Sequence, residues 1–206
     1  FRRHFIALTK ASGQGDLEAT LASAKTALKI AKKQKWLDLQ VVVYMAVGAT
    51  HLNVGDIQSA LEQYSHAEET AAVADEKGHP AGKQLIVQAR FAKGAALVSD
   101  GNFKEAAPLY ESIAPLTIEL EDRIMSLEAW RMAAYCYEAS KNWQEAWRCG
   151  EAALDVGEKM DDEKRAASTL PYVGQGLLRL TQKRAVRDRE GHVHVKMHQL
   201  VGEYSQ

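Results

Sequence analysis

The chain has 206 residues, with 26 Lys and Arg against 27 Asp and Glu, so its formal net charge is −1. A near-neutral chain lacks the basic character that nucleic-acid-binding and membrane-surface proteins usually show. Hydrophobic residues make up 46% and charged residues 26%, which excludes a disordered chain and allows a substantial core. Four prolines and 7% aromatic residues favour helices over a β-sandwich or barrel.

Two cysteines, Cys136 and Cys149, are too few for a disulfide framework, and no metal-binding spacing surrounds them. Both stand in helical patterns beside small residues, so we expect buried free thiols. No segment approaches the ~20 apolar residues of a membrane span, and no signal peptide is evident. We therefore expect a cytoplasmic protein that does not enter membranes.

Four turn signals recur along the chain at intervals of 40, 46 and 40 residues. Each ends in Asp or Asn before an apolar residue, as a helix N-cap requires. In the last two, Glu105 and Glu145 stand where a capping box places its acid. The recurrence predicts helical hairpins joined by these turns. The turns are Gly15-Asp16-Leu17, Gly55-Asp56-Ile57, Gly101-Asn102-Phe103 and Lys141-Asn142-Trp143.

Matching positions flank the turns. A small residue seven positions before the turn, as at Gly48, predicts that two helices approach closely. After each of the last three turns, small and apolar residues are spaced to share one helical face. They are Ala60, Tyr64 and Ala67, then Ala106, Tyr110 and Ile113, then Ala146, Gly150 and Ala153. A fifth, incomplete unit fits at the same interval with Leu170, Val173, Gly174 and Leu177.

Periodicity and turn signals together predict a chain of helices in antiparallel hairpins. Pro108 and Pro115 fall inside one of these helices, where we expect a kink near Pro108 and an early end near Pro115. The predicted helices span residues 2–12, 16–34, 36–53, 56–76, 80–100, 103–119, 121–140, 142–160, 163–181 and 184–205.

This arrangement resembles the tetratricopeptide repeat (TPR) family, in a long-repeat variant. The second unit supplies most of the family pattern: Tyr44, Val47-Gly48, His51, Gly55-Asp56-Ile57, Ala60, Tyr64 and Ala67. Arg90 and Lys93 depart from it, because the family prefers bulky apolar residues there. The resemblance implies an all-α fold, an α-solenoid of antiparallel helical hairpins closed by a C-terminal capping helix. It also implies one domain, 1–206, with five units of about 1–40, 41–86, 87–126, 127–166 and 167–206.

In the TPR family the first helix of each hairpin lines a concave face that holds peptides. The family's Lys/Asn/Arg clamp for a terminal carboxylate is absent here, because Met45, Ala49, Phe91, Ala92 and Arg131 occupy its positions. The face is apolar at its centre, which suits an amphipathic helix or an extended apolar segment. The alternative is that Phe5, Met45 and Phe91 pack among the long helices. Transferred to this sequence, the contact positions include Met45, Ala49, Leu52, Asn53, Gln88, Phe91, Ala95, Val98, Arg131 and Tyr135.

The resemblance implies a non-catalytic scaffold that binds a peptide or helical segment of a partner protein, without cofactor or metal. No nucleotide-binding, zinc-protease or hydrolase motif argues for an enzyme. Two alternatives stay open: a self-association module that forms a homo-oligomer, and a regulatory or sensing TPR domain of a larger protein. An apolar stripe near the C-terminus serves either as an end cap or as a contact between copies. It comprises Val193, Met197, Leu200, Val201 and Tyr204.

The same C-terminal region offers two further hypotheses. His192, His194 and His198 are spaced to share a metal ion on a helix, but a polar face of the capping helix explains them equally well. A basic stretch over residues 179–196 could attract nucleic acid. No RNA-binding aromatic motif accompanies it, so a solvated helix face is the preferred interpretation.

Overall fold

The computed structural model describes residues 2–159 of the chain, and every regular element in that range is an α-helix. The all-α prediction is confirmed over this range. The helices predicted at 163–181 and 184–205, with the fifth unit and the capping helix, lie outside the described residues. The observed helices are α1 (Arg2–Gly13), α2 (Leu17–Gln34), α3 (Leu37–Asn53), α4 (Ile57–Glu76), α5 (Gly82–Ser99), α6 (Phe103–Glu111), α7 (Ala114–Glu119), α8 (Arg123–Ala139) and α9 (Trp143–Glu158).

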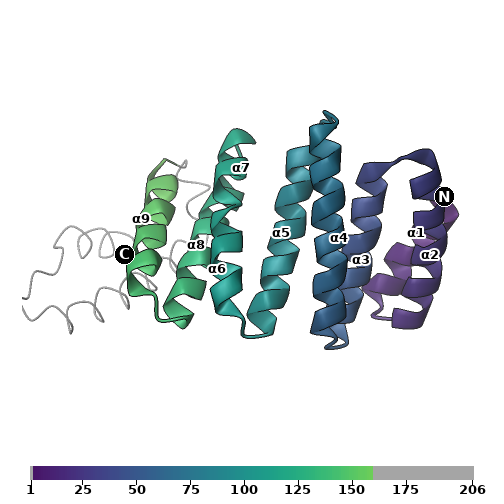
Figure 1. Cartoon of the computed structure of the whole chain (residues 1–206), viewed down its shortest axis with the longest axis horizontal. Helices are drawn as coiled ribbons and strands as arrows, with labels where there is room; N and C mark the ends of the chain where they lie inside the picture. The colour runs from purple at the N-terminus through teal and green to yellow at the C-terminus, as the bar shows by residue number, and fades with distance from the viewer. Residues whose placement is uncertain (1, 160–206) are drawn as a thin grey trace, which may run out of the picture. The chain divides into compact units, whose positions relative to one another are not determined.

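Packing divides the chain into two compact units that meet in sequence between Asn102 and Phe103. In unit 1, the first helices α1, α3 and α5 contact one another in that order (Figure 1). The second helices α2 and α4 each pack against the first helix on either side. In unit 2, α8 packs against α6, α7 and α9. Both units are thus built from antiparallel helices joined by short turns, and the division into five repeat units stays a prediction.

The four predicted turns are confirmed, and all of them share one hydrogen-bond pattern. In each, the amide of the Asp or Asn donates to the carbonyl five residues earlier, at 2.9–3.1 Å. The residue just before it has a positive φ, which glycine adopts without strain. The φ values are 69° at Gly15, 82° at Gly55, 74° at Gly101 and 64° at Lys141. Lys141 therefore adopts a left-handed backbone conformation, whereas glycine occupies the same position in the other three turns.

Side-chain capping agrees with the prediction at two helices and differs at a third. Asp16 accepts a hydrogen bond from the Ala19 amide at 3.0 Å, and Asp56 accepts one from the Ser59 amide at 3.2 Å. The capping box predicted at Asn142 is wrong, because the Asn142 side chain makes no cap bond. Its expected partner, Glu145, instead accepts from Arg148 Nε at 2.7 Å.

The helix predicted over 103–119 is two helices, α6 and α7, separated at residues 112–113. Pro108 lies inside α6, whereas Pro115 lies in the first turn of α7. Because Pro115 has no amide to donate to the Glu111 carbonyl, a continuous helix would lose that bond and suffer a clash. Pro115 therefore ends α6 early, as expected, and a new helix starts around it.

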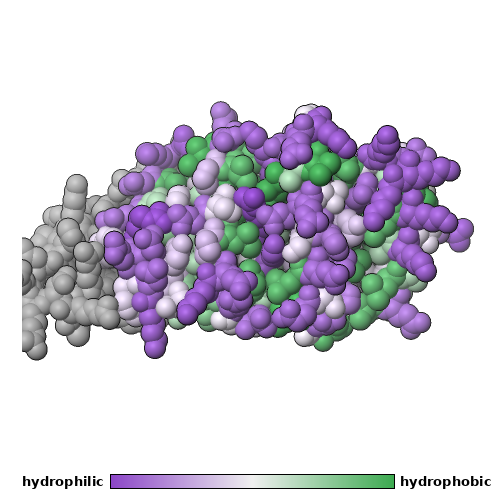
Figure 2. All heavy atoms as spheres, in the orientation of Figure 1, coloured by the Kyte–Doolittle hydropathy of each residue, from purple (hydrophilic) through white to green (hydrophobic). Residues whose placement is uncertain are grey.

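The core combines small residues of the second helices with larger apolar residues of the first helices, such as Leu8, Val43 and Val87. Ala60, Tyr64 and Ala67 of α4 are 0–3% exposed, and the matching residues of α9 are buried as predicted. Ala106 and Tyr110 of α6 are buried too, whereas Ile113 is buried beyond the end of that helix. A Cβ added to Gly48 would lie 2.7 Å from Cε1 of Tyr64, so α3 and α4 approach as closely as predicted. The surface seen in Figure 2 is mainly hydrophilic, with apolar residues between the charged ones.

Candidate binding face on the first helices

The predicted contact residues of unit 1 lie on α3 and α5, two first helices that contact each other. Each helix carries a large apolar residue, an alanine and another large apolar residue at positions i, i+4 and i+7. That spacing puts the three side chains on one face of the helix. None is fully buried: Met45, Ala49, Leu52, Phe91 and Val98 are half-buried, and Asn53, Gln88 and Ala95 are exposed. Their role in binding stays a prediction.

Two of these residues also contact the core. Met45 and Leu52 pack against a buried cluster that contains Tyr64 and Ala96. Phe5 packs in the same way against the cluster around Leu8. Core packing therefore holds Met45 and Leu52 from one side, while part of each side chain remains at the surface.

A close backbone contact positions α5 against α4. A Cβ added to Gly82 would lie 2.5 Å from the Cα of Asp75, so only glycine allows this approach without a shift of the backbone. The residue follows a turn in which the His79 amide donates to the Ala74 carbonyl at 2.9 Å. Gly82 thus fixes the start of the helix that carries half of the candidate face.

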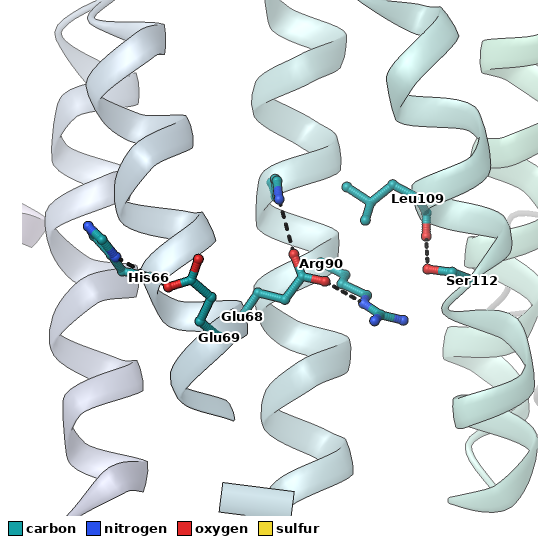
Figure 3. A network of polar contacts seen from close by, with 7 residues as sticks. His66, Glu68, Glu69, Arg90, Leu109 and Ser112 are labelled. Atoms are coloured by element: carbon teal, nitrogen blue, oxygen red, sulfur yellow. Dashed lines mark hydrogen bonds and ion pairs between the residues drawn. The ribbon is translucent and has the colours of Figure 1, made fainter. Parts of the chain in front are cut away.

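A half-buried carboxylate fixes the middle of α5. Glu68 of α4 accepts hydrogen bonds from Arg90 Nε at 2.8 Å and from Lys93 Nζ at 3.1 Å (Figure 3). Burial by itself would raise the pKa of Glu68, but the hydrogen bonds and charges of the two cations outweigh it and lower the pKa. This ion pair explains why basic residues stand where the TPR pattern has apolar ones. Sequence reasoning noticed the departure and missed its partner, Glu68.

The two predicted contact residues on α8 belong to unit 2. Arg131 is paired along its own helix, because Nη2 lies 2.7 Å from Glu128 Oε2. Tyr135 is 48% exposed, and its ring meets Phe103 edge-on with centroids 5.8 Å apart. The positive charge of Arg131 is therefore already paired with a carboxylate of its own helix.

A second polar network in unit 2 was not predicted. Glu111 of α6 accepts from the Tyr137 hydroxyl at 3.0 Å and from Arg148 Nη2 at 2.6 Å. The Arg148 guanidinium also lies 6.0 Å from the ring centroid of Trp130. Burial and the bond to Glu111 raise the pKa of Tyr137 to about 12. The network ties α6, α8 and α9 together, and no spacing in the sequence marks it.

Other expected chemistry is tested only over residues 2–159. Cys136 and Cys149 are buried free thiols as predicted, and burial raises the pKa of each to about 12. This part of the chain holds no group of three or more His, Cys, Asp and Glu side chains arranged for a metal ion. Nor does it hold a helix both long and apolar enough to cross a membrane. The cluster of His192, His194 and His198 and the basic stretch 179–196 lie outside the described residues.

Comparison with known proteins identifies the fold. No family model and no curated protein sequence matches the chain. BtubC (BKLC) from P. vanneervenii matches with a TM-score of 0.69 at 12% identity, over 99% of this chain and 80% of that one. A putative kinesin light chain from Podosopora anserina, with nearly identical TPR-like repeats, matches with a TM-score of 0.64 at 15% identity, over 100% and 96%. The apo form of RapI matches with a TM-score of 0.64 at 14% identity, over 98% and 66%. The chain therefore has the TPR-like helical-repeat fold.

Proposed function

We propose that the chain is a non-catalytic interaction scaffold that binds a peptide or helical segment of a partner protein on the α3–α5 face. The observation that carries this proposal is the repeated pattern of incompletely buried apolar residues on two neighbouring first helices. Met45, Ala49 and Leu52 on α3 match Phe91, Ala95 and Val98 on α5. The TPR-like fold supports the same function.

The pattern indicates how a partner would dock. A side chain that approaches Ala49 or Ala95 meets a methyl group flanked by larger apolar side chains one turn away. An amphipathic helix presents apolar side chains at a similar spacing, so its apolar face would match both rows. Asn53 and Gln88 lie at opposite ends of the rows, and they would offer amide hydrogen bonds to the polar edge of the partner. Arg131 and Tyr135 are proposed as contact residues of unit 2, to be tested separately.

Selection from a library of displayed peptides, followed by affinity measurement against variants, tests the face. Ala49→Glu and Ala95→Glu add a charge to it, and because Ala and Glu have similar helix propensities these variants should fold. We expect the selected peptides to be apolar or amphipathic and to bind these variants at least about tenfold more weakly. Met45→Glu/Phe91→Glu should abolish binding.

Ala22→Glu is the matched control, because Ala22 is an exposed alanine on α2, a second helix. Peptide binding should survive this change. Peptides that bind all of the variants as tightly as the unmodified chain would overturn the α3–α5 assignment.

A further inference from the structure

The near-zero net charge of the chain conceals a strong separation of charge. Residues 1–35 contain eight Lys and Arg and two acidic residues, whereas residues 36–206 contain 18 Lys and Arg and 25 acidic residues. The first hairpin is therefore strongly basic and the remainder of the chain is acidic. Separation of this kind favours contact between the two regions in different molecules when they do not meet within one.

Four of these eight basic residues lie on α2. Its side chains Lys25, Lys29, Lys32 and Lys33 are all exposed and follow one another at helical spacing; we call them the lysine row. The row stands opposite the buried alanines of α2, Ala24, Ala27 and Ala31. Lys25, Lys29 and Lys33 therefore face away from the first helices, whereas Lys32 reaches the ring of Tyr44 on α3. In Figure 2, hydrophilic side chains predominate at the end of unit 1 that carries α1 and α2.

A row of opposite charge lies on α4. Glu62, Glu69 and Glu76 are exposed and are spaced by seven residues, so they lie on one face; we call them the glutamate row. This face stands opposite the buried alanines of α4, which include Ala67, Ala71 and Ala74. His66 lies within the row, with its ring nitrogens 3.9 Å from Glu62 and 3.7 Å from Glu69.

The two rows form no direct ion pair with each other within one molecule, and the ring of Tyr44 lies between Lys32 and His66. The rows lie on different helices, α2 and α4, and helix α3 packs against both of them. Among the described residues no ion pair joins a side chain of the lysine row to one of the glutamate row. Lys32 interacts instead with the ring of Tyr44, whose centroid lies 5.7 Å from Nζ.

We propose that two copies of the chain associate through these rows, with α2 of each copy on α4 of the other. A twofold axis parallel to the helices places each lysine row over the partner's glutamate row and makes the contact isologous. Both helices begin just after the turn of their hairpin, so α2 and the opposing α4 run in the same direction in this arrangement.

The register of charges along the two helices supports this pairing. At a rise of about 1.5 Å per residue, Lys25, Lys29 and Lys33 lie about 12, 18 and 24 Å from the start of α2. On the same scale, Glu62, Glu69 and Glu76 lie about 7.5, 18 and 28.5 Å from the start of α4. Lys29 is thus level with Glu69, and the outer lysines are offset from a glutamate by about 4.5 Å, which a lysine side chain spans.

Two exposed apolar residues would be covered by the same contact. Leu21 on α2 is 41% exposed and Val73 on α4 is 37% exposed, and each belongs to the face that carries its charged row. Val73 is level with Lys33 in the proposed register, so the lysine methylenes would pack on it while the ammonium group reaches Glu76. A second copy of the chain thus matches both the charge and the apolar content of these faces.

Sedimentation velocity of the full 206-residue chain tests the proposal. We expect a dimer at about 50 mM salt and a dissociation constant at least about tenfold higher at about 500 mM salt, because salt screens exposed charges. Two triple variants reverse one row each: Lys25→Glu/Lys29→Glu/Lys33→Glu and Glu62→Lys/Glu69→Lys/Glu76→Lys. Each should be monomeric alone, and an equimolar mixture of the two should form a heterodimer.

The control variant Lys10→Glu/Lys104→Glu/Lys141→Glu changes three other exposed lysines and should dimerise like the unmodified chain. Ala49→Glu/Ala95→Glu should also dimerise, which separates this inference from the proposed peptide binding. A chain that is monomeric at low salt, even one that binds polyglutamate, would overturn the proposal. Dimers that survive either charge reversal, or a mixture without heterodimers, would overturn it as well.

Discussion

Gly48 lies directly against the ring of Tyr64, so closely that a Cβ at Gly48 would be 2.7 Å from Cε1 and 2.9 Å from Cδ1. Tyr64 is only 3% exposed and its ring packs in a buried cluster, so it has little room to move. This contact sets the separation of α3 and α4, and with it the place of the α3 side chains on the candidate face.

Gly48→Ala should therefore destabilise the protein by about 1–2 kcal/mol, because overpacking outweighs the gain in helix propensity. Urea unfolding followed by circular dichroism measures the change. Gly13→Ala is the matched control, since a Cβ at that helical glycine meets nothing within 4 Å. The control should be neutral or stabilising by up to about 1 kcal/mol, and equal effects of the two changes would contradict the packing argument.

Glu68→Gln should destabilise the protein by about 1 kcal/mol at neutral pH, because the bonds from Arg90 and Lys93 lose their charged acceptor. The pKa of Glu68 is lowered from 4.5 in the folded state, so its contribution is complete above that pH. The contribution is lost as the pH falls through the lowered pKa, and the two proteins should then become equally stable. Glu151→Gln, at an exposed position on α9, should have little effect at any pH.

Tyr137→Phe should cost about 1 kcal/mol at neutral pH through loss of the bond to Glu111. Because the folded pKa of Tyr137 is raised from 10.0 to about 12, its contribution is complete below pH 10 and decreases as the pH rises towards 12. Denaturant unfolding at neutral and alkaline pH measures the difference. An equal loss from Tyr135→Phe, at an exposed position, would argue against the assigned role of the hydroxyl.

Lys141→Gly should stabilise the protein by about 0.5–1 kcal/mol, because glycine adopts the φ of 64° without a steric penalty. The thermal midpoint should rise accordingly. Lys104→Gly removes another exposed lysine, but it lies inside helix α6 and should destabilise by about 1 kcal/mol. A lower midpoint for Lys141→Gly would show that its side chain contributes more than the strain costs.

Cys136 and Cys149 should react slowly with a thiol reagent near pH 8 in the native protein, because burial raises the pKa of each thiol to about 12. In urea both should react at the rate of a model thiol. Fast labelling of either cysteine without denaturant would contradict the burial of α8 against α9.

The repeat could be predicted because it depends on local chemistry. A turn glycine, an N-cap acid such as Asp16 or Asp56 and a small residue such as Gly48 each act within a few residues, and their recurrence predicted the hairpins. Pro115 predicted that the helix over 103–119 ends early. It did not predict that a second helix, α7, begins directly afterwards. Which side chain caps a helix depends on which other partners are near. The Glu145 carboxylate accepts a hydrogen bond from Arg148, and the capping box expected with Asn142 does not form.

The polar contacts between helices were not predictable from spacing. Glu68 and Arg90 are 22 residues apart, and Glu111 and Arg148 are 37 apart, so their pairing depends on how the helices pack. The lysine row leaves no mark on the net charge for a different reason. The net charge of the whole chain is only −1, because acidic residues after the first hairpin balance its lysines and arginines.

The boundary between Asn102 and Phe103 has a consequence for how such a chain can change length. By sequence, α5 belongs to the third hairpin, yet Gly82 and Arg90 dock it onto α4 of the second. The first helix of a hairpin thus packs on the second helix of the hairpin before it, as α3 does on α2 and α5 does on α4. Duplication or deletion of whole hairpins therefore keeps the same order of helix packing, and only the side chains at the new junction have to adapt.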